Sequence, residues 1–271
     1  MRIGAIADLH IDLNHHYAPM DYQNMLSHYI QAQRFDLFII AGDISNQQTL
    51  TLSFIQALEQ QSGCKVVYVP GNHDMWEPAE TTPKHTQQIF DRYRSDPHCL
   101  VGHPRMLNPT TALIGHMGWY NYAYAAKRFS KERLATGRYK IALWQDKRHL
   151  DWGVSDPDLS KQFTQQLTED LQSVNAKAII LATHLVTHPA FVPPLPDRRF
   201  DFYNAYLATD DIYPLYQAYP IRTSIMGHLH VRHTLTDQHL TLHCVSLGYY
   251  QQWSSPSLAQ EIADATVIIN V

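Results

Sequence analysis

Five short strand-like segments, each followed at once by polar or ionisable side chains, constrain the fold of this chain more than any other feature. Four are mainly apolar runs, at residues 2–7, 36–41, 65–69 and 178–182, and the fifth occupies residues 221–226. Each has the length of a strand, and the absence of a polar alternation in the four apolar runs indicates strands that are covered on both faces. We therefore expect five buried strands in the core of the protein.

Helical patterns separate several of these runs. Residues 22–34 place Leu26 and Ile30 four positions apart, and further helices are predicted over residues 49–61, 83–94 and 158–174. Alternating strands and helices predict an α/β fold with a largely parallel sheet and right-handed crossovers. The chemistry of such a sheet is expected at the carboxyl edge of its strands.

Shorter strand signals and one irregular segment complete the pattern. The signals lie at residues 99–101, 111–115, 234–235, 240–245 and 267–271, and the last three suggest a second sheet packed on the first. Residues 118–153 are rich in aromatic and basic side chains and resemble an insertion over the core. At 271 residues, we expect one domain, residues 1–271, that carries this cap-like insertion.

The residues that follow the first three runs are typical metal ligands. Asp8 and His10 are two positions apart, so both can point to the same side of an extended chain. Asp43 follows Gly42, which allows a sharp turn, and the third run leads into Asn72, His73 and Asp74. The first two patterns alone are also compatible with an ordinary turn, whereas few structural turns need the third combination.

Imidazoles follow the remaining two runs. His184 comes directly after the fourth, and His228 and His230 follow the fifth. His188 is an alternative to His184, but it precedes a proline in a loop, so we favour His184. Five strand ends with oxygen or imidazole ligands indicate a metal centre, and the lack of thiolates favours Mn, Fe or Zn.

The ordered motifs DLH, GD, GNHD, H and GHLH, from Asp8 to His230, resemble those of the calcineurin-like metallophosphoesterase superfamily. The resemblance implies a four-layer α/β/β/α sandwich, in which two mixed sheets pack face to face between helices. It also implies two metal ions per chain, bridged by Asp43. The other ligands would be Asp8, His10 and His230 for the first metal, and Asn72, His184 and His228 for the second.

By the same resemblance, His73 stays off the metals and acts on the substrate phosphate, with Asp74 fixing its orientation. The predicted activity is hydrolysis of a phosphomonoester or phosphodiester by a hydroxide that bridges the two metals. The sequence has no GxSxG elbow and no P-loop that would supply a different mechanism. A catalytically silent scaffold would be expected to lack some ligands, and none is missing.

Charge and composition limit which binding partners and which location are expected for the protein. The 21 Lys and Arg against 25 Asp and Glu give a formal charge of −4, which disfavours nucleic acid as a partner and a nuclease as the alternative function. No stretch approaches the ~18 apolar residues of a membrane span, and no signal peptide is apparent, so we expect a cytoplasmic protein. Cys64, Cys99 and Cys244 have no paired spacing and are expected to be buried thiols.

The insertion is the predicted source of substrate contacts. Residues 118–153 hold eight Lys and Arg against three Asp and Glu, so they carry +5 within a chain of −4. We expect Trp119, Tyr120, Lys127 and Arg128 to recognise a small organophosphate or a nucleotide-like substrate. The alternative is a solvated basic face whose aromatic rings pack on the core.

Overall fold

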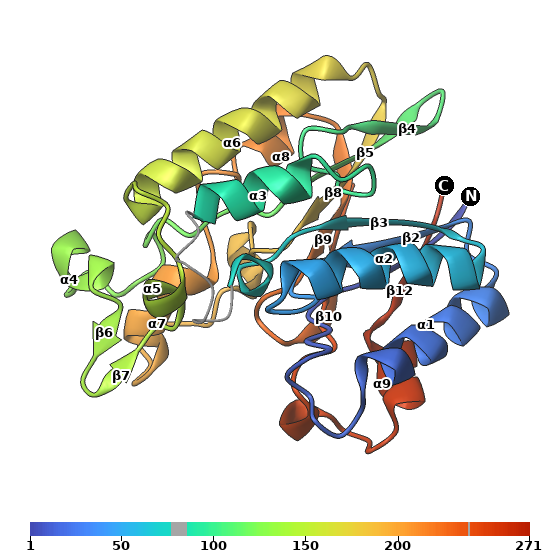
Figure 1. The fold of residues 1–271 in the computed structure, drawn as a ribbon. Coiled ribbons are helices and arrows are strands. Elements are labelled where there is room, and N and C mark those ends of the chain that lie inside the picture. The colour runs from blue at the N-terminus through green and yellow to red at the C-terminus, as the bar shows by residue number, and fades with distance from the viewer. Residues whose placement is uncertain (77–85, 238) are drawn as a thin grey trace.

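The computed structural model describes residues 1–76, 86–237 and 239–271, and its core is two mixed sheets that pack face to face (Figure 1). The first sheet has the order β12-β1-β2-β3, and the second has the order β10-β11-β9-β8-β5-β4. The strands of the first sheet are β1 (Arg2–Ile6), β2 (Leu37–Ala41), β3 (Lys65–Val69) and β12 (Val267–Asn270). Those of the second are β4 (Arg105–Asn108), β5 (Thr111–His116), β8 (Ala178–Thr183), β9 (Ile221–Met226), β10 (Arg232–Asp237) and β11 (Leu240–Val245).

Helices cover the outer faces of both sheets. Below the first sheet in Figure 1 lie α1 (Pro19–Gln33), α2 (Gln48–Ser62) and α9 (Leu258–Ala265). Outside the second sheet lie α6 (Asp156–Ser173), next to α3 (Thr86–Arg94), and α8 (Leu215–Ala218). The result is the expected α/β/β/α sandwich.

Burial on both faces explains why the strands read as continuous apolar runs. In β2, Leu37 and Ile39 point into the layer between the two sheets, whereas Phe38 and Ile40 point toward the helices. Because side chains alternate along a strand, a strand between two apolar layers has no solvent-facing position for a polar residue. The same packing makes Ile180 and Ile225 of the second sheet part of the layer between the sheets.

Two strand predictions need correction. The segment over residues 267–271 was expected in the second sheet, but β12 pairs antiparallel with β1, so that the two chain termini lie side by side (Figure 1). Residues 99–101 form no strand, and only an isolated bridge joins Cys99 to Tyr68. The predicted helix over residues 83–94 is described from Thr86 onward, and its first three residues lie outside the described part of the chain.

The insertion carries small elements at one end of the sandwich (Figure 1). They are α4 (Lys131–Ala135), β6 (Arg138–Tyr139), β7 (Ala142–Leu143) and α5 (Asp146–His149), and they lie beside α7 (Phe200–Leu207). Aromatic packing joins the two segments, since the rings of Trp144 and Tyr206 stack with centroids 5.1 Å apart. The insertion is therefore anchored on the edge where the strands of both sheets end.

Candidate metal centre

The seven predicted ligands meet where the parallel strands end. The chain leaves β1, β2 and β3 of the first sheet, and β8 and β9 of the second, at this common edge. Their ligand atoms form two groups, within each of which all atoms lie within 4.8 Å of one another. The first group is Asp8, His10, Asp43 and His230, and the second contains Asp43, His184 and His228.

Asp43 belongs to both groups and faces a histidine in each. Its Oδ2 lies 3.7 Å from Nε2 of His10, and its Oδ1 lies 3.3 Å from Nε2 of His184. The Oδ1 of Asn72 adds an oxygen to the second group, 3.0 Å from both His184 Nε2 and His228 Nδ1. The arrangement matches the division of ligands that the family resemblance implies.

Hydrogen bonds on the far side of three rings direct a lone pair into the centre. His184 donates from Nδ1 to the carbonyl of Ala41 at 2.9 Å, and His228 donates from Nε2 to the carbonyl of Tyr206 at 3.0 Å. His230 has its Nδ1 2.8 Å from Oε1 of Gln252. Such outer contacts fix the tautomer of a metal-binding histidine, so that the other nitrogen is free to ligate.

The facing nitrogens make the site suitable for cations. The two nitrogens that point into the second group, His228 Nδ1 and His184 Nε2, lie only 3.3 Å apart. Two lone pairs at that distance repel each other unless a proton or a metal ion is shared between them. The nitrogens His10 Nε2 and His230 Nε2 also approach each other, to 3.1 Å, in the first group.

The pKa shifts differ from one histidine of the site to the next. Burial and the neighbouring His184 lower the pKa of His228 to about 3, and burial lowers that of His10 well below its usual value, so both rings are neutral as ligation requires. Burial opposes a charge on His184, but the Asp43 carboxylate outweighs it and raises the pKa of His184 to about 9. Asp43 is buried as well, yet His184 and His73 hold its pKa well below the usual range.

The backbone is strained at most of these ligands. Positive φ angles occur at Asp8 (57°), His10 (44°), Asp43 (55°), His228 (69°) and His230 (52°). Side-chain-bearing residues seldom adopt this region, although Asp and His tolerate it better than most. Concentrated backbone strain of this kind is typical of functional sites.

Glycines provide the space for the ligands. A Cβ on Gly71 would lie 2.2 Å from Oδ1 of Asp43, and a Cβ on Gly42 would lie 2.5 Å from Nδ1 of His184. Gly42 also has a φ of 88°. Close approach therefore requires glycine at both positions, and the left-handed conformation requires it at Gly42 as well.

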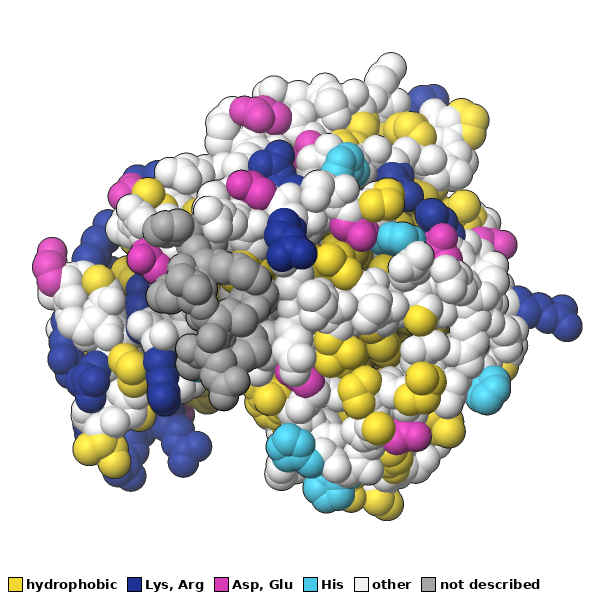
Figure 2. Space-filling model, in the orientation of Figure 1, with side chains coloured by type: hydrophobic (Ala, Val, Ile, Leu, Met, Phe, Trp, Pro, Cys, Tyr) yellow, Lys and Arg dark blue, Asp and Glu magenta, His cyan; other side chains and the backbone are white. Residues whose placement is uncertain are grey.

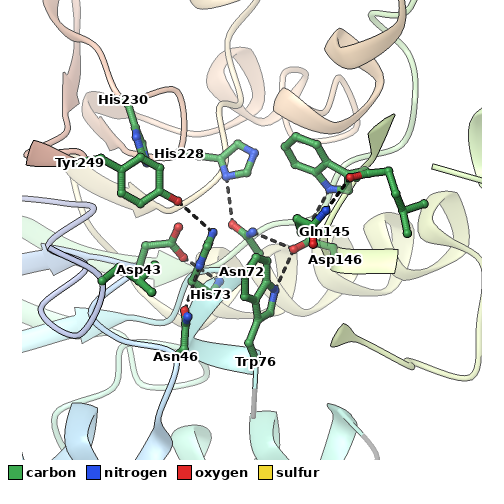
Figure 3. A pocket seen from close by; sticks show the side chains of 13 residues that line it. Asp43, Asn46, Asn72, His73, Trp76, Gln145, Asp146, His228, His230 and Tyr249 are labelled. Carbon is green, nitrogen blue, oxygen red and sulfur yellow. Dashed lines mark hydrogen bonds between the residues drawn. The ribbon is translucent and has the colours of Figure 1, made fainter. Parts of the chain in front are cut away.

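His73 lies beside the ligand groups, but Asp74 does not orient it as predicted. The His73 Nδ1 is 2.9 Å from Oδ1 of Asn46, and its Nε2 is 3.5 Å from the hydroxyl of Tyr249 (Figure 3). The Asp74 carboxylate instead accepts hydrogen bonds from the backbone N–H groups of Ile44, Ser45 and Gly71. Asp74 thus stabilises the loops after β2 and β3, and Asn46 is the partner of the His73 ring.

The four residues predicted to bind substrate do not line the cavity over the ligand groups. Trp119 and Tyr120 are buried in the core, where the Trp119 indole donates to Asp156 at 2.9 Å. Lys127 and Arg128 are exposed, and Arg128 pairs with Asp201 at 2.8 Å. In Figure 2, Lys and Arg side chains gather on the outer surface at the end of the molecule that carries the insertion.

A different part of the insertion reaches the site. A cavity of about 460 Å³ opens over the ligand groups, and Leu143, Trp144, Gln145 and Asp146 form one side of it (Figure 3). Its other walls include Leu13, Asn46, Trp76 and Tyr249. The sequence offered little signal for these contacts, apart from the position of Asn46 three residues after Asp43.

Other predicted residues lie away from the ligand groups. His188 precedes a short turn and packs edge-on against Tyr213, so the structure favours His184 as the histidine of the centre. Cys64, Cys99 and Cys244 are buried free thiols, as predicted. Within residues 1–76, 86–237 and 239–271, no helix combines the length and apolar character needed to cross a bilayer.

Comparisons with known proteins agree with the fold and the motif order. The structure is similar to phosphopantetheinyl hydrolase from Mycobacterium tuberculosis, with a TM-score of 0.73, 17% identity, and coverage of 93% of this chain and 90% of that one. It also resembles a dimetal phosphatase from Danio rerio, with a TM-score of 0.52, 13% identity and coverage of 91% and 87%. At these identities the likeness shows a shared fold only.

A search of curated proteins gave no match to the sequence. The family model for calcineurin-like phosphoesterases, however, matches residues 1–232, which include all seven ligand positions and the whole motif order. The chain therefore belongs to the calcineurin-like phosphoesterase family.

Proposed function

We propose that this protein is a dinuclear metal-dependent phosphoesterase that hydrolyses a small phosphomonoester or phosphodiester. The observation that carries the proposal is the pair of ligand groups that share the Asp43 carboxylate, with ring nitrogens aimed into each. Cations bound between these nitrogens would balance both the repulsion between their lone pairs and the charge of the buried carboxylates.

Two cations bound by these groups would activate a water molecule for attack and bind the oxygens of the phosphate. Oxygen and imidazole ligands favour Mn, Fe or Zn. The protein would hold the phosphate group next to His73. Both His73 and Tyr249 line the cavity, and the His73 Nε2 points toward the hydroxyl of Tyr249. His73 would donate a hydrogen bond or a proton to the phosphate or to the leaving group.

The walls of the cavity support a carbon-rich leaving group. Leu13, Trp76, Leu143, Trp144 and Tyr249 provide apolar and aromatic surface beside the ligand groups. Among the described residues that line the cavity, none is Lys or Arg. We therefore favour an uncharged organic group with a flat or aliphatic portion over a substrate that carries a second phosphate.

The test combines metal analysis with a substrate panel. Purified protein is expected to contain two transition-metal ions per chain by elemental analysis, and removal of both by a chelator should abolish hydrolysis that Mn²⁺ then restores. The panel would include aryl and alkyl phosphates, nucleotides and a phosphopantetheinyl ester, the last because of the similar fold described above. Hydrolysis that persisted in metal-free protein would overturn the proposal.

A further inference from the structure

Asp146, a buried carboxylate of the insertion, contacts one of the proposed ligands from behind. It is 2% exposed and lies at the start of α5. Its Oδ1 accepts hydrogen bonds from Asn72 Nδ2 and from the Trp76 indole, each at 2.9 Å (Figure 3). Its Oδ2 accepts a third, from the Trp144 indole, at 2.9 Å. The carboxylate is therefore surrounded by donors, and this requires it to act as an acceptor.

This contact determines which way the Asn72 amide points. An indole N–H can only donate, so the two tryptophans hold Asp146 as an acceptor, and Asp146 in turn requires the NH₂ group of Asn72 to face it. The oxygen of the amide must then face the opposite side, where it lies 3.0 Å from His184 Nε2 and His228 Nδ1. Only the oxygen end of an amide can bind a cation.

We propose that Asp146 is a positioning residue for the second metal, which it serves by fixing the Asn72 oxygen toward His184 and His228. The inference rests on the proposed dinuclear centre. It also links the insertion to that centre, because Asp146 and Trp144 belong to the insertion, whereas Asn72 and Trp76 follow β3. The insertion thus contributes to metal binding as well as to the wall of the cavity.

Asp146→Asn is the direct test. The new amide must present its NH₂ either to Trp144 or to Asn72 and Trp76. The first orientation leaves the Trp144 indole without its acceptor and loosens the contact, and in the second Asn72 regains a partner only by turning its oxygen away from the metal. We expect one of the two metals to bind about 10- to 100-fold more weakly, as is typical when an outer partner of a ligand is lost, and the other to be unaffected. Equilibrium dialysis against graded Mn²⁺, followed by elemental analysis, measures both.

Asp156→Asn is a matched control. Asp156 is a buried carboxylate that also accepts an indole N–H, from Trp119 at 2.9 Å, but it contacts no member of the ligand groups. Its replacement should lower thermal stability and leave Mn²⁺ binding unchanged. An equal loss of metal in both variants would mean that any damage to the packing around the insertion weakens the centre, and would overturn a specific role for Asp146.

A rescue variant addresses the orientation itself. In Asn72→Asp/Asp146→Asn, the carboxylate at position 72 offers oxygen on both sides and the amide at position 146 can donate to it, so Mn²⁺ stoichiometry should return to two. Failure of this rescue in a folded double variant would overturn the inference. Equal binding of two ions by the wild type and by Asp146→Asn would also overturn it. If the wild-type protein binds fewer than two ions, the proposed dinuclear centre fails together with the inference.

Discussion

Replacing His73 with alanine separates catalysis from metal binding at this site. The ring contacts Asn46 and Tyr249 through its nitrogens and stacks on Trp76 with centroids 3.8 Å apart. Its side chain belongs to neither ligand group. The Asp43 carboxylate is held by the backbone N–H of His73, at 2.8 Å, and alanine preserves that donor. Both metals should therefore remain bound in His73→Ala.

The expected loss lies in turnover. Removing a general acid or a transition-state hydrogen-bond donor costs roughly 10²- to 10⁴-fold in kcat, which corresponds to about 3 to 5 kcal/mol in the barrier. If His73 protonates the leaving group, the loss should be larger for an alkyl phosphate than for an aryl phosphate, whose phenolate leaves without help. If His73 acts on a phosphate oxygen instead, both esters should lose the same factor.

His149→Ala is the matched control, since His149 stacks on Trp76 with centroids 4.3 Å apart and is exposed. This variant also removes an imidazole that stacks on the Trp76 indole, but His149 does not contact the ligand groups. We therefore expect kcat to change by less than about threefold. The assay is steady-state kinetics on the two esters, with metal content measured on the same samples. A His73→Ala protein that lost a metal, or one that kept wild-type kcat, would refute this role for His73.

Three further predictions concern the bridge, the cavity wall and acid stability. Asp43→Asn should weaken both metals by at least roughly 10-fold in equilibrium dialysis, and loss of only one would show that it does not bridge. Leu143→Ala should raise KM for a bulky ester by about 10-fold yet spare phenyl phosphate, whereas Lys127→Ala, on the exposed surface, should change neither value. Burial lowers the pKa of His116 to about 4 from 6.5, so its neutral form stabilises the fold above pH 6.5, and that contribution is lost as the pH falls toward 4. His116→Asn should therefore remove up to about 3 kcal/mol of the pH dependence between those limits in urea unfolding, and an unchanged slope would contradict the assignment.

Local sequence predicted the longer helices and most strands of the core, but not how the strands are distributed between the sheets. The predicted bounds of β3 and β9 coincide with the structure, and in β3 the apolar run Val66–Val69 is buried throughout. The segment that forms β12 is also apolar, but Ile268 is exposed and the strand joins the first sheet beside β1. A hydrophobic pattern can indicate a strand, but it contains no information about which strand will lie next to it.

In the site, too, local sequence predicted some residues, while others depend on tertiary packing. The candidate ligand positions follow the ends of predicted strands, so strand assignment, residue type and the family resemblance of the motif order were enough to predict the cluster that the structure brings together. Asp146 reaches Asn72 across 74 residues of sequence, through the packing of the insertion. Composition likewise could not distinguish Trp119 from Trp144. The indole of Trp119 donates a hydrogen bond to Asp156 in the core, whereas Trp144 lines the cavity. Contacts that tertiary packing creates leave no periodic signal in the chain.

The strained backbone at the ligands is supported by hydrogen bonds between the ligand loops themselves. Asp8 N–H donates to the Gly42 carbonyl at 2.9 Å, and His10 N–H donates to the Asp43 carbonyl at 3.0 Å. The Asp8 carboxylate also accepts the N–H of His228, at 3.0 Å. A positive φ costs of order 1–3 kcal/mol at a residue with a side chain, and it persists only where neighbouring contacts over-determine it. Each loop here is hydrogen-bonded to the next, and these contacts fix the positions of the candidate ligands. The DLH, GD and GHLH motifs would therefore meet two requirements at once, a ligand atom and a residue that tolerates the left-handed conformation, and Asp and His satisfy both.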